Sequence, residues 1–360
     1  MKEILCIRLD NMGDVLMSTP AIRALKNAYS SRITLLTSTA GAQIAESIPE
    51  IDEVIISDVP WMKHEDLSFT SQDFMGLVDT LKYRGFDAAI IFTVYSQNPL
   101  ATALVAYLAE IPIRVAYCRE NPYGLLTHWI PEEEPFAYIR HQVQRDLDLA
   151  GLAGAVAEDQ TLSLEVDESR WPALLQQLTQ RGVNVELPWI ILHPGVSDAK
   201  RQYPLPAWMG VAQRLIKEMN VQLLITGVEE EFELAEMIKE QAGEGCFNLA
   251  GAFGLEDFIT LIRHSRLVIS VNTGTVHIAA ATNTPVLVLY ALTNPQHTPW
   301  KVNAMVLYFD VPEDLMSRNG IIRYVHDRCV EEQPPLATEE NIMQAAAYLM
   351  VHNVMAFTAS

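Results

Sequence analysis

Short apolar runs alternate with longer amphipathic segments along the whole chain. In the clearest example, the β-branched run 267–271 predicts a buried strand, the Ala-rich segment 276–282 predicts a helix, and residues 286–290 predict a further strand. The same strand–loop–helix order starts at residues 4–9 and restarts at residues 189–193. Strands that alternate with helices are typical of parallel sheets, so the pattern predicts two α/β halves.

The restart also predicts the domain boundaries. We expect one domain at residues 1–170, a linker at 182–188, a second domain at 185–335 and a final helix at 338–356. Parallel sheets bind ligands at the carboxyl ends of their strands. Two halves that face each other would therefore form the site in the cleft between them.

The composition excludes several classes of protein. Lys and Arg total 25 against 45 Asp and Glu, which gives a formal net charge of −20 at pH 7. A nucleic-acid binder needs a basic face, so we expect no nucleic-acid partner. The N-terminal MKEILCIRL is too short and too charged for a signal peptide, and no apolar run approaches transmembrane length. The four isolated cysteines disfavour disulfides and fit a cytosolic protein.

The chain also lacks the common motifs of several chemistries. It contains no GxGxxG after a strand, no Walker A motif, no HExxH and no GxSxG. Metalloenzyme and serine hydrolase interpretations therefore lose support. We expect neither a metal nor a bound cofactor.

A polar loop joins the strand and the helix of the example given first. The loop comprises Asn272, Thr273, Gly274 and Thr275, and His277 falls in the first helical turn. Backbone N–H groups at such a turn point outward with the helix dipole behind them, which makes a site for anions, most often phosphate. The alternative is an ordinary βαβ unit in which Thr273 only caps the helix.

Two carboxylates follow the first predicted strand. Asp14 lies at the carboxyl edge of the N-terminal sheet, where a carboxylate can act as a general base. The alternative is that Asp14 only favours the N-terminus of its helix. Asp10 is the rival base, although its place directly after the strand favours a role in bracing the loop.

The first loop of the second half carries a basic pair. His193 ends the predicted strand, and Ser197, Lys200 and Arg201 follow on the loop. Lys200 and Arg201 would neutralise a diphosphate there, unless both are solvated surface cations.

Further charged residues are candidates for binding. Glu229, Glu230 and Glu231 follow a strand, where a single carboxylate can hold a ribose hydroxyl pair, or where acidic residues simply favour a first helical turn. In the first half, residues 119–135 are predicted to be irregular and residues 137–150 helical. The cations of this half that are candidates for an anionic acceptor are Lys63, His64, Arg114, Arg119, Arg140 and Arg145.

Three stretches resemble one family when they are taken in order. IRLDNMGDVLMSTPAIRALK, LHPGVSDAKRQYP and SVNTGTVHIAAATNTPVLVLY are similar to motifs of the ADP-heptose:lipopolysaccharide heptosyltransferases, bacterial glycosyltransferase family nine. The resemblance covers nearly the whole chain. It implies an α/β GT-B fold, with two Rossmann-like, doubly wound domains that face each other across a cleft and a C-terminal helix packed on the first domain.

The resemblance also implies roles for individual residues. By position, Asp14 corresponds to the proposed catalytic base, Lys200 to the lysine at the donor phosphates, and Thr273, Gly274 and His277 to the donor-phosphate loop. Glu229 or Glu230 would face the nucleoside. Asn272 departs from the family pattern, which has Asp, and this change leaves the choice of donor open.

The expected function follows from this resemblance. It implies an inverting glycosyltransferase that moves a heptose from ADP-heptose to a lipopolysaccharide core or related anionic glycan, with the first domain for the acceptor and the second for the nucleotide sugar. The enzyme would be cytoplasmic, and peripheral contact with the cytoplasmic face of the inner membrane stays open. Alternatives are a transferase of the same fold with another nucleotide sugar, a nucleotide-sugar epimerase and a non-catalytic nucleotide-sugar binding protein.

Overall fold

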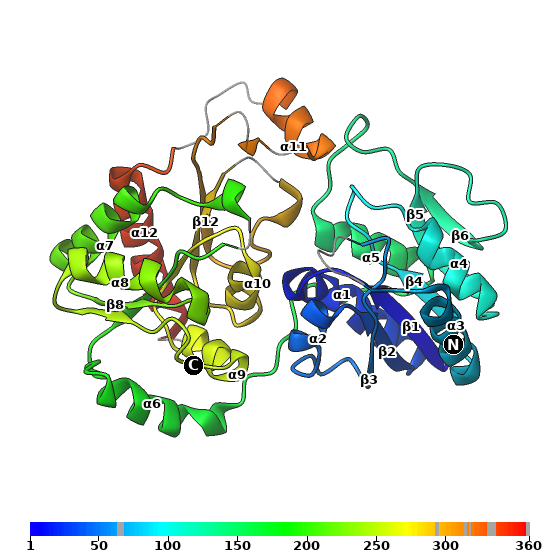
Figure 1. Ribbon diagram of the computed structural model, residues 1–360, viewed down its shortest axis with the longest axis horizontal. Coiled ribbons are helices and arrows are strands. Elements are labelled where there is room, and N and C mark those ends of the chain that lie inside the picture. The colour runs from blue at the N-terminus through cyan, green and yellow to red at the C-terminus, as the bar shows by residue number, and fades with distance from the viewer. Residues whose placement is uncertain are drawn as a thin grey trace. The chain divides into compact units, whose positions relative to one another are not determined.

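The computed structural model describes residues 1–62, 68–196, 198–291, 295–312, 315–316, 318–329 and 336–357. The chain divides into two compact units (Figure 1). The first unit is Met1–Glu165 with Pro295–His297, and the second is Val166–Asn294 with Thr298–Ser360.

The first unit contains a six-stranded sheet in which every neighbouring pair of strands is parallel, in the order β3-β2-β1-β4-β5-β6. Its strands are β1 (Glu3–Arg8), β2 (Arg32–Thr37), β3 (Glu53–Ile56), β4 (Ala88–Ile91), β5 (Ile113–Cys118) and β6 (His128–Pro131). Its helices are α1 (Met12–Tyr29), α2 (Thr39–Ala45), α3 (Ser71–Arg84), α4 (Leu100–Leu108), α5 (Gln142–Leu152) and the 3₁₀ turn η4 (Pro295–His297).

Helices cover both faces of this sheet. Leu5 and Ile7 of β1 pack into a core cluster with residues of α3 and α4. Ile4 and Cys6 alternate with them and are fully buried on the opposite face. Burial on both faces explains why these strands are continuous apolar runs in the sequence.

The second unit repeats this architecture with the strand order β12-β11-β10-β7-β8-β9, again all parallel. Its strands are β7 (Trp189–His193), β8 (Gln222–Ile225), β9 (Cys246–Asn248), β10 (Val268–Val271), β11 (Val286–Tyr290) and β12 (Ala304–Tyr308). Its α-helices are α6 (Trp171–Gln180), α7 (Leu205–Met219), α8 (Phe232–Ala242), α9 (Leu255–Arg263), α10 (Gly274–Ala281), α11 (Gly320–Tyr324) and α12 (Glu339–Phe357). Short helical turns are η1 (Glu168–Arg170), η2 (Ala199–Arg201), η3 (Glu229–Glu231) and the π-turn η6 (Val325–Cys329).

The C-terminal helix α12 packs within the second unit. Ile342, Ala346 and Leu349 are fully buried in a core cluster with Trp208 of α7 and Leu289 of β11. The sequence prediction had placed this helix on the first domain. In the structure, its apolar residues complete the face of the second sheet that α7 and α8 also cover.

Two local predictions are corrected. Residues 119–135 are not irregular throughout, because β6 extends the first sheet from β5. The helix expected at 137–150 begins only at Gln142, since His141 accepts a hydrogen bond from Val143 N and so caps it. Arg140 therefore lies before the helix and not on it.

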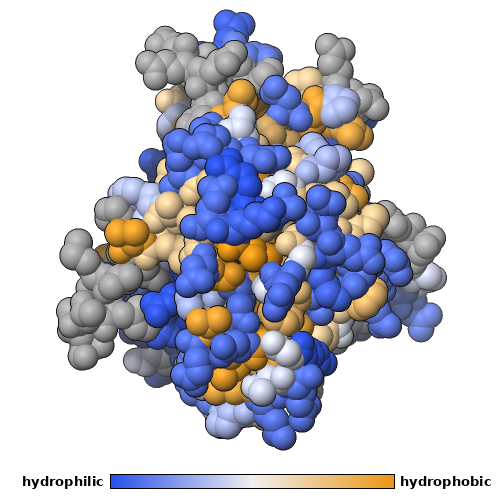
Figure 2. Space-filling view, turned by 90° about the vertical axis from the view of Figure 1, so that its left-hand side faces the viewer, coloured by the Kyte–Doolittle hydropathy of each residue, from blue (hydrophilic) through white to orange (hydrophobic). Residues whose placement is uncertain are grey.

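The surface of the second unit is mainly polar where Figure 2 shows it, from the side that carries α7 and α8. The hydrophobic residues on this face are scattered, as single exposed apolar residues commonly are. Within the described residues, none of the helices has the length and apolar character needed to cross a membrane.

Both strand orders are those of the doubly wound Rossmann fold. In each sheet the order reverses beside the first strand of the unit, between β1 and β4 and between β7 and β10. Loops that leave neighbouring strands in opposite directions open a crevice there, where such sheets bind ligands. The two switch points therefore position the candidate site residues.

Candidate active site

Asp14 lies in the first turn of α1, beside the last residue of β1. Arg8 Nη2 donates a hydrogen bond to Asp14 Oδ1 at 3.1 Å. The Arg8 side chain is fully buried, and Arg8 Nε lies 3.0 Å from Asp10 Oδ2. Asp14 therefore does more than favour the helix N-terminus, because its carboxylate belongs to a buried charge cluster.

Asp10, the rival base, occupies the loop of the same cluster. Burial raises the pKa of Asp10 to about 6, although the Arg8 guanidinium acts in the opposite direction. Gln97 donates a hydrogen bond to Asp10 Oδ1 from the loop after β4. These contacts fit the bracing role expected for Asp10 and join the two sides of the first switch point.

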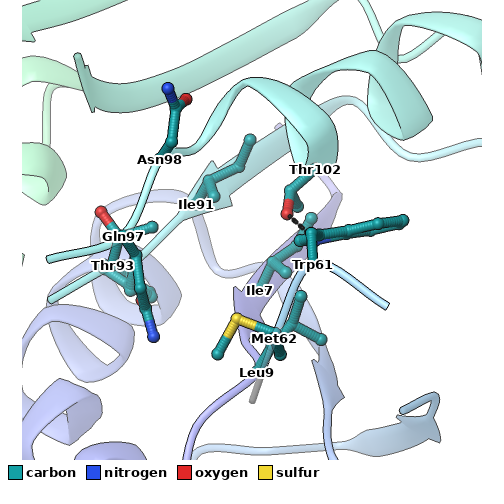
Figure 3. A pocket seen from close by; sticks show the side chains of 10 residues that line it. Ile7, Leu9, Trp61, Met62, Ile91, Thr93, Gln97, Asn98 and Thr102 are labelled. Carbon is teal, nitrogen blue, oxygen red and sulfur yellow. Dashed lines mark hydrogen bonds between the residues drawn. The ribbon is translucent and has the colours of Figure 1, made fainter. Parts of the chain in front are cut away.

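A small cavity of about 20 Å³ lies beside Gln97, at the ends of β1 and β4 (Figure 3). Trp61 closes one side and is held by a hydrogen bond from Nε1 to Thr102 Oγ1 at 3.0 Å. Such a volume is enough for about one water molecule. The polar side chains that line the cavity are Thr93, Gln97, Asn98 and Thr102.

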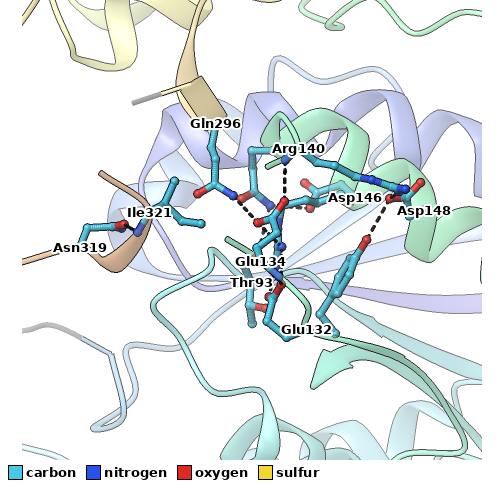
Figure 4. A network of polar contacts seen from close by, with 12 residues as sticks. Thr93, Glu132, Glu134, Arg140, Asp146, Asp148, Gln296, Asn319 and Ile321 are labelled. Atoms are coloured by element: carbon cyan, nitrogen blue, oxygen red, sulfur yellow. Dashed lines mark hydrogen bonds and ion pairs between the residues drawn. The ribbon is translucent and has the colours of Figure 1, made fainter. Parts of the chain in front are cut away.

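A second buried charge cluster lies under the loop before α5 (Figure 4). Arg145 binds Glu132 at 2.7 Å and Glu134 at 2.8 Å, and its guanidinium lies over the Tyr117 ring, 4.4 Å from the centroid. Gln296 of η4 donates a hydrogen bond to Glu134 Oε2 at 2.6 Å. This cluster fixes the β6–α5 loop and attaches η4 to the first unit.

Four cations were predicted to bind the acceptor, and two of them, Arg119 and Arg140, lie within the described residues. The guanidinium of each lies over an aromatic ring. Arg119 follows β5 and lies 4.2 Å from the Tyr95 ring centroid. Arg140 lies 4.6 Å from the Tyr138 centroid, pairs with Asp148, and keeps 40% of its side chain exposed. The other two predicted cations, Lys63 and His64, lie outside the described residues.

The remaining two candidate cations of the first half, Arg114 and Arg145, hold loops in place. Arg114 donates to the carbonyl oxygens of Leu125 at 2.7 Å and Gly124 at 2.9 Å, and Arg145 belongs to the buried cluster. Both are therefore committed to holding loops at the edge of the sheet.

In the second unit, the predicted anion loop lies at the second switch point. Asn272 to Thr275 follow β10, and α10 begins at Gly274, two residues earlier than expected. Thr273 is the N-cap residue, but among the described residues its side chain makes no capping hydrogen bond and lies 3.3 Å from Ser270 Oγ. The simple capping alternative is thus not supported. His277 is buried in the first turn.

The loop after β7 meets this anion loop. Arg201 Nη1 donates to the Asn272 carbonyl oxygen at 3.3 Å. Lys200, on the same turn η2, has a 38% exposed side chain and pairs with Asp198 at 2.8 Å. This hydrogen bond with the Lys200 ammonium lowers the pKa of Asp198. Ser197 lies outside the described residues.

His193 ends β7 beneath these loops. Its Nδ1 lies 3.0 Å from Thr226 Oγ1 at the end of β8. Burial lowers the pKa of His193 to about 4, so the imidazole is neutral at pH 7. It supports the floor of the site and adds no charge to it.

The three glutamates after β8 differ in their surroundings. Glu229 and Glu230 are exposed. Glu231 is half-buried, and its carboxylate occupies the space that a side chain at Gly195 or Gly227 would need. Glu231 Oε2 accepts a hydrogen bond from Val228 N at 3.0 Å, and burial raises its pKa. Of the three glutamates, Glu231 is thus the one whose carboxylate turns in at the strand ends.

Sequence reasoning missed several members of these sites. Arg8 was counted only as part of a strand, and Asp146 and Gln97 were not singled out. A signal existed for Arg8, since an arginine within a buried apolar strand needs a carboxylate partner. Glu231 was named only together with Glu229 and Glu230, and the signal that separates it from them is its position three residues after Val228, the spacing at which a glutamate reaches back to the helix start. Among the described residues, no group of His, Cys, Asp and Glu has the arrangement of a metal site.

The sequence profile of glycosyltransferase family 9 (heptosyltransferase) matches residues 75–316. The chain belongs to this family. Among characterised relatives, it is 28% identical over 313 residues to lipopolysaccharide heptosyltransferase 2 of Escherichia coli (strain K12), covering 82% of this chain and 85% of the relative. The family resemblance noted in the sequence is thereby confirmed.

Solved structures give the same result for the fold of this family 9 enzyme. E. coli ADP-heptose lps heptosyltransferase II superposes with a TM-score of 0.71 at 23% identity, covering 98% of this chain and 99% of that chain. E. coli heptosyltransferase WaaC with ADP gives a TM-score of 0.68 at 18% identity, covering 96% and 99%. The predicted α/β GT-B fold is confirmed, and the protein is a glycosyltransferase.

Proposed function

We propose that the protein is an inverting heptosyltransferase that moves a heptose from ADP-heptose to a hydroxyl of a lipopolysaccharide core or a related glycan. Membership of family 9 supports transfer of a heptose. The characterised relative is named for lipopolysaccharide, and the related WaaC structure holds ADP.

One observation supports the part of this proposal that concerns binding of the nucleotide-sugar donor. The Arg201 hydrogen bond to the Asn272 carbonyl joins the two loops of the second switch point. Lys200 precedes Arg201 on the turn η2, so this contact ties the turn that carries both cations to the loop that starts α10. A cation and a helix N-terminus in one crevice match the charge of a nucleoside diphosphate.

The transfer step follows from these groups. The acceptor hydroxyl attacks the anomeric carbon, and Asp14 takes its proton. The bond between that carbon and the ADP oxygen breaks, and the leaving ADP keeps the electron pair. Lys200 and the N–H groups at the start of α10 stabilise the charge that grows on the diphosphate. Attack from the side opposite the leaving group inverts the anomeric configuration.

Arg119 and Arg140 are the proposed contacts for an anionic acceptor. Both are at the carboxyl edge of the first sheet, after β5 and before α5. Stacking on Tyr95 and Tyr138 orients their guanidinium groups, which bind phosphate or carboxylate in a fork. Pairing with Asp148 leaves part of Arg140 accessible.

The donor assignment is tested by calorimetric titration with ADP, UDP and GDP. We expect selective ADP binding, weakened roughly tenfold to a hundredfold by Lys200→Ala, because a charge-assisted contact with the diphosphate is lost. Lys239→Ala is the matched control, since Lys239 is 40% exposed and pairs with Glu236 at 2.7 Å in the last turn of α8. A preference for UDP or GDP would exclude ADP-heptose as the donor.

The base is tested with two isosteric variants. Asp14→Asn should lower the rate of transfer about 100- to 10,000-fold, the usual contribution of a general base, while calorimetry shows unchanged ADP affinity. Asp10→Asn should keep most of the activity. The reverse result, an inactive Asp10→Asn beside an active Asp14→Asn, would assign the base to Asp10.

A further inference from the structure

One buried arginine connects three carboxylates in the first unit. The fully buried Arg8 side chain lies 3.0 Å from Asp10, 3.1 Å from Asp14 and 3.7 Å from Asp146, measured between the nearest nitrogen and oxygen atoms. The carboxylates come from the loop after β1, from α1 and from α5. Residues distant in sequence are thus brought to a single cation.

The three carboxylates are not equivalent in exposure. The exposed fraction of the side chain is 16% for Asp14, 10% for Asp10 and 1% for Asp146. Asp14 is therefore the member best able to meet a substrate. The other two are placed to act on Arg8.

Asp146 and Asp10 are themselves held in place. Asp146 accepts hydrogen bonds from Ser18 at 2.7 Å and from Gln142 at 2.8 Å, and Asp10 accepts one from Gln97. Donors from α1, α5 and the β4–α4 loop thereby fix both carboxylates. A guanidinium held on two sides presents its third edge to Asp14 in one orientation.

The charges within the cluster do not balance. Burial alone would lower the pKa of Arg8. The three carboxylates together raise it by more than burial lowers it, so the pKa of Arg8 lies above its ordinary value and the side chain stays charged. Burial raises the pKa of both Asp10 and Asp146. One cation faces three acids, and the more buried acids are therefore those that hold a proton most readily.

We propose that Arg8 is a positioning residue for the transfer step, which orients Asp14 and keeps it ionised, with Asp10 and Asp146 holding Arg8 for that purpose. The proposal rests on the proposed function, in which Asp14 is the base. Arg8 acts through Asp14, since a fully buried side chain does not reach the substrate.

The titratable and charged groups that are coupled through this cluster come from four parts of the fold. Arg8 from β1 and Asp10 from the loop after β1 interact directly with Asp14 of α1, whereas Cys6 of β1 and Arg145 of α5 are coupled to Asp146 of α5. Weakening the cation should make Asp14 ionise at higher pH, and removing a neighbouring carboxylate should make it ionise at lower pH. These opposite signs separate an electrostatic role from a merely structural one.

Two variants test the proposal through the pH profile of kcat. In Arg8→Lys a single ammonium replaces the planar group whose three nitrogens face three carboxylates, so we expect kcat to fall roughly a hundredfold and the acid limb to move to higher pH. In Asp146→Asn we expect a smaller loss and an acid limb at lower pH. The KM for the donor should not change in either variant. Arg23→Lys is the matched control, because Arg23 also bridges two carboxylates, Glu50 and Asp159, and lies on α1.

A second measurement is independent of the substrates. Carboxyl ¹³C NMR of Asp-labelled protein, with the Asp14 signal assigned through Asp14→Asn, follows the ionisation of Asp14 in each variant. Ionisation of Asp14 at higher pH in Arg8→Lys and at lower pH in Asp146→Asn supports the proposal. It is overturned if both variants titrate at the wild-type pH, or if Arg8→Lys retains wild-type kcat. Failure of the proposed function is seen separately, as wild-type protein that transfers no heptose while these NMR shifts persist.

Discussion

At the scale of single residues, buried charge is concentrated at the carboxyl end of the first sheet. Arg8 and Asp146 are almost wholly buried, and so are Arg145 and Glu134 nearby. Burying charge is costly unless it is paired, and here each ion pair also fixes a loop or a candidate catalytic group. The stability of the chain should therefore depend on pH through these groups.

Asp10 gives the clearest pH prediction for stability. Its folded-state pKa of about 6 lies above the ordinary value of 3.8, so its favourable contribution is present below about pH 4 and is lost as pH rises through about 6. Asp10→Asn removes this dependence. Relative to that variant, the wild type should lose up to about 3 kcal/mol of unfolding free energy between pH 4 and 7, measured by urea denaturation.

Asp87→Asn is the control with the opposite sign. Backbone hydrogen bonds from Lys2 and Glu3 lower the pKa of Asp87, so that its contribution is present at pH 7 and lost on acidification. If Asp10→Asn and Asp87→Asn change stability with pH in the same direction, the burial argument for Asp10 is wrong.

The sequence singled out candidate residues whose surroundings are local. Asp14 and Thr273 were proposed because each follows an apolar strand within a few residues. Asp146 was missed because it meets Arg8 only through the packing of α5 against α1, across more than a hundred residues of chain. Glu231 was not distinguished from Glu229 and Glu230, because only the folded loop shows which of the three adjacent glutamates turns inward.

At the scale of elements, buried strands were predicted well. The strands β7 and β11 have the predicted bounds, because burial on both faces makes their whole length apolar. The edge strand β6 was missed, since it is short, mostly exposed and ends at Pro131. The start of α5 was misplaced because a side chain, His141, provides the cap.

Close packing at α2 predicts a contrast between two glycines. A Cβ added at Gly41 would lie 2.2 Å from Thr37 Oγ1 and 2.9 Å from the Asp10 carbonyl oxygen. Gly41→Ala should therefore destabilise the protein by about 1–3 kcal/mol and disturb the Asp10 loop. Thermal unfolding measures the effect.

Gly76→Ala is the matched substitution. Gly76 lies inside α3, and no described atom comes within 4 Å of a Cβ added there. Alanine should raise stability by about 0.5–1 kcal/mol, because it favours the helix more than glycine does. Equal effects at the two positions would contradict the packing described for α2.

At the scale of the whole molecule, the chain is two versions of one topology. Each unit has the same doubly wound strand order, and Asp14 in the first unit and the loop from Asn272 to Thr275 in the second each follow a strand at the switch point. The repeated pattern made the fold class predictable. The placement of α12 was not predictable from it, since an amphipathic helix does not specify which sheet it covers.

Removal of a buried side chain from α12 tests its place in the second unit. Leu349 is fully buried in that core, so Leu349→Ala should cost about 2–5 kcal/mol of unfolding free energy. Val351, two residues on, is 66% exposed, and Val351→Ala should change stability by less than about 0.5 kcal/mol. Similar costs for the two variants would show that α12 does not pack as described.

The most direct measurement incubates the protein with ADP-heptose and a panel of core oligosaccharides truncated at successive sugars, followed by mass spectrometry and NMR of the product. We predict the addition of one heptose with inverted anomeric configuration and release of ADP, slowed about 100- to 10,000-fold by Asp14→Asn and largely kept by Asp10→Asn. An altered nucleotide sugar in the absence of acceptor, or full transfer by Asp14→Asn, would contradict the assignment.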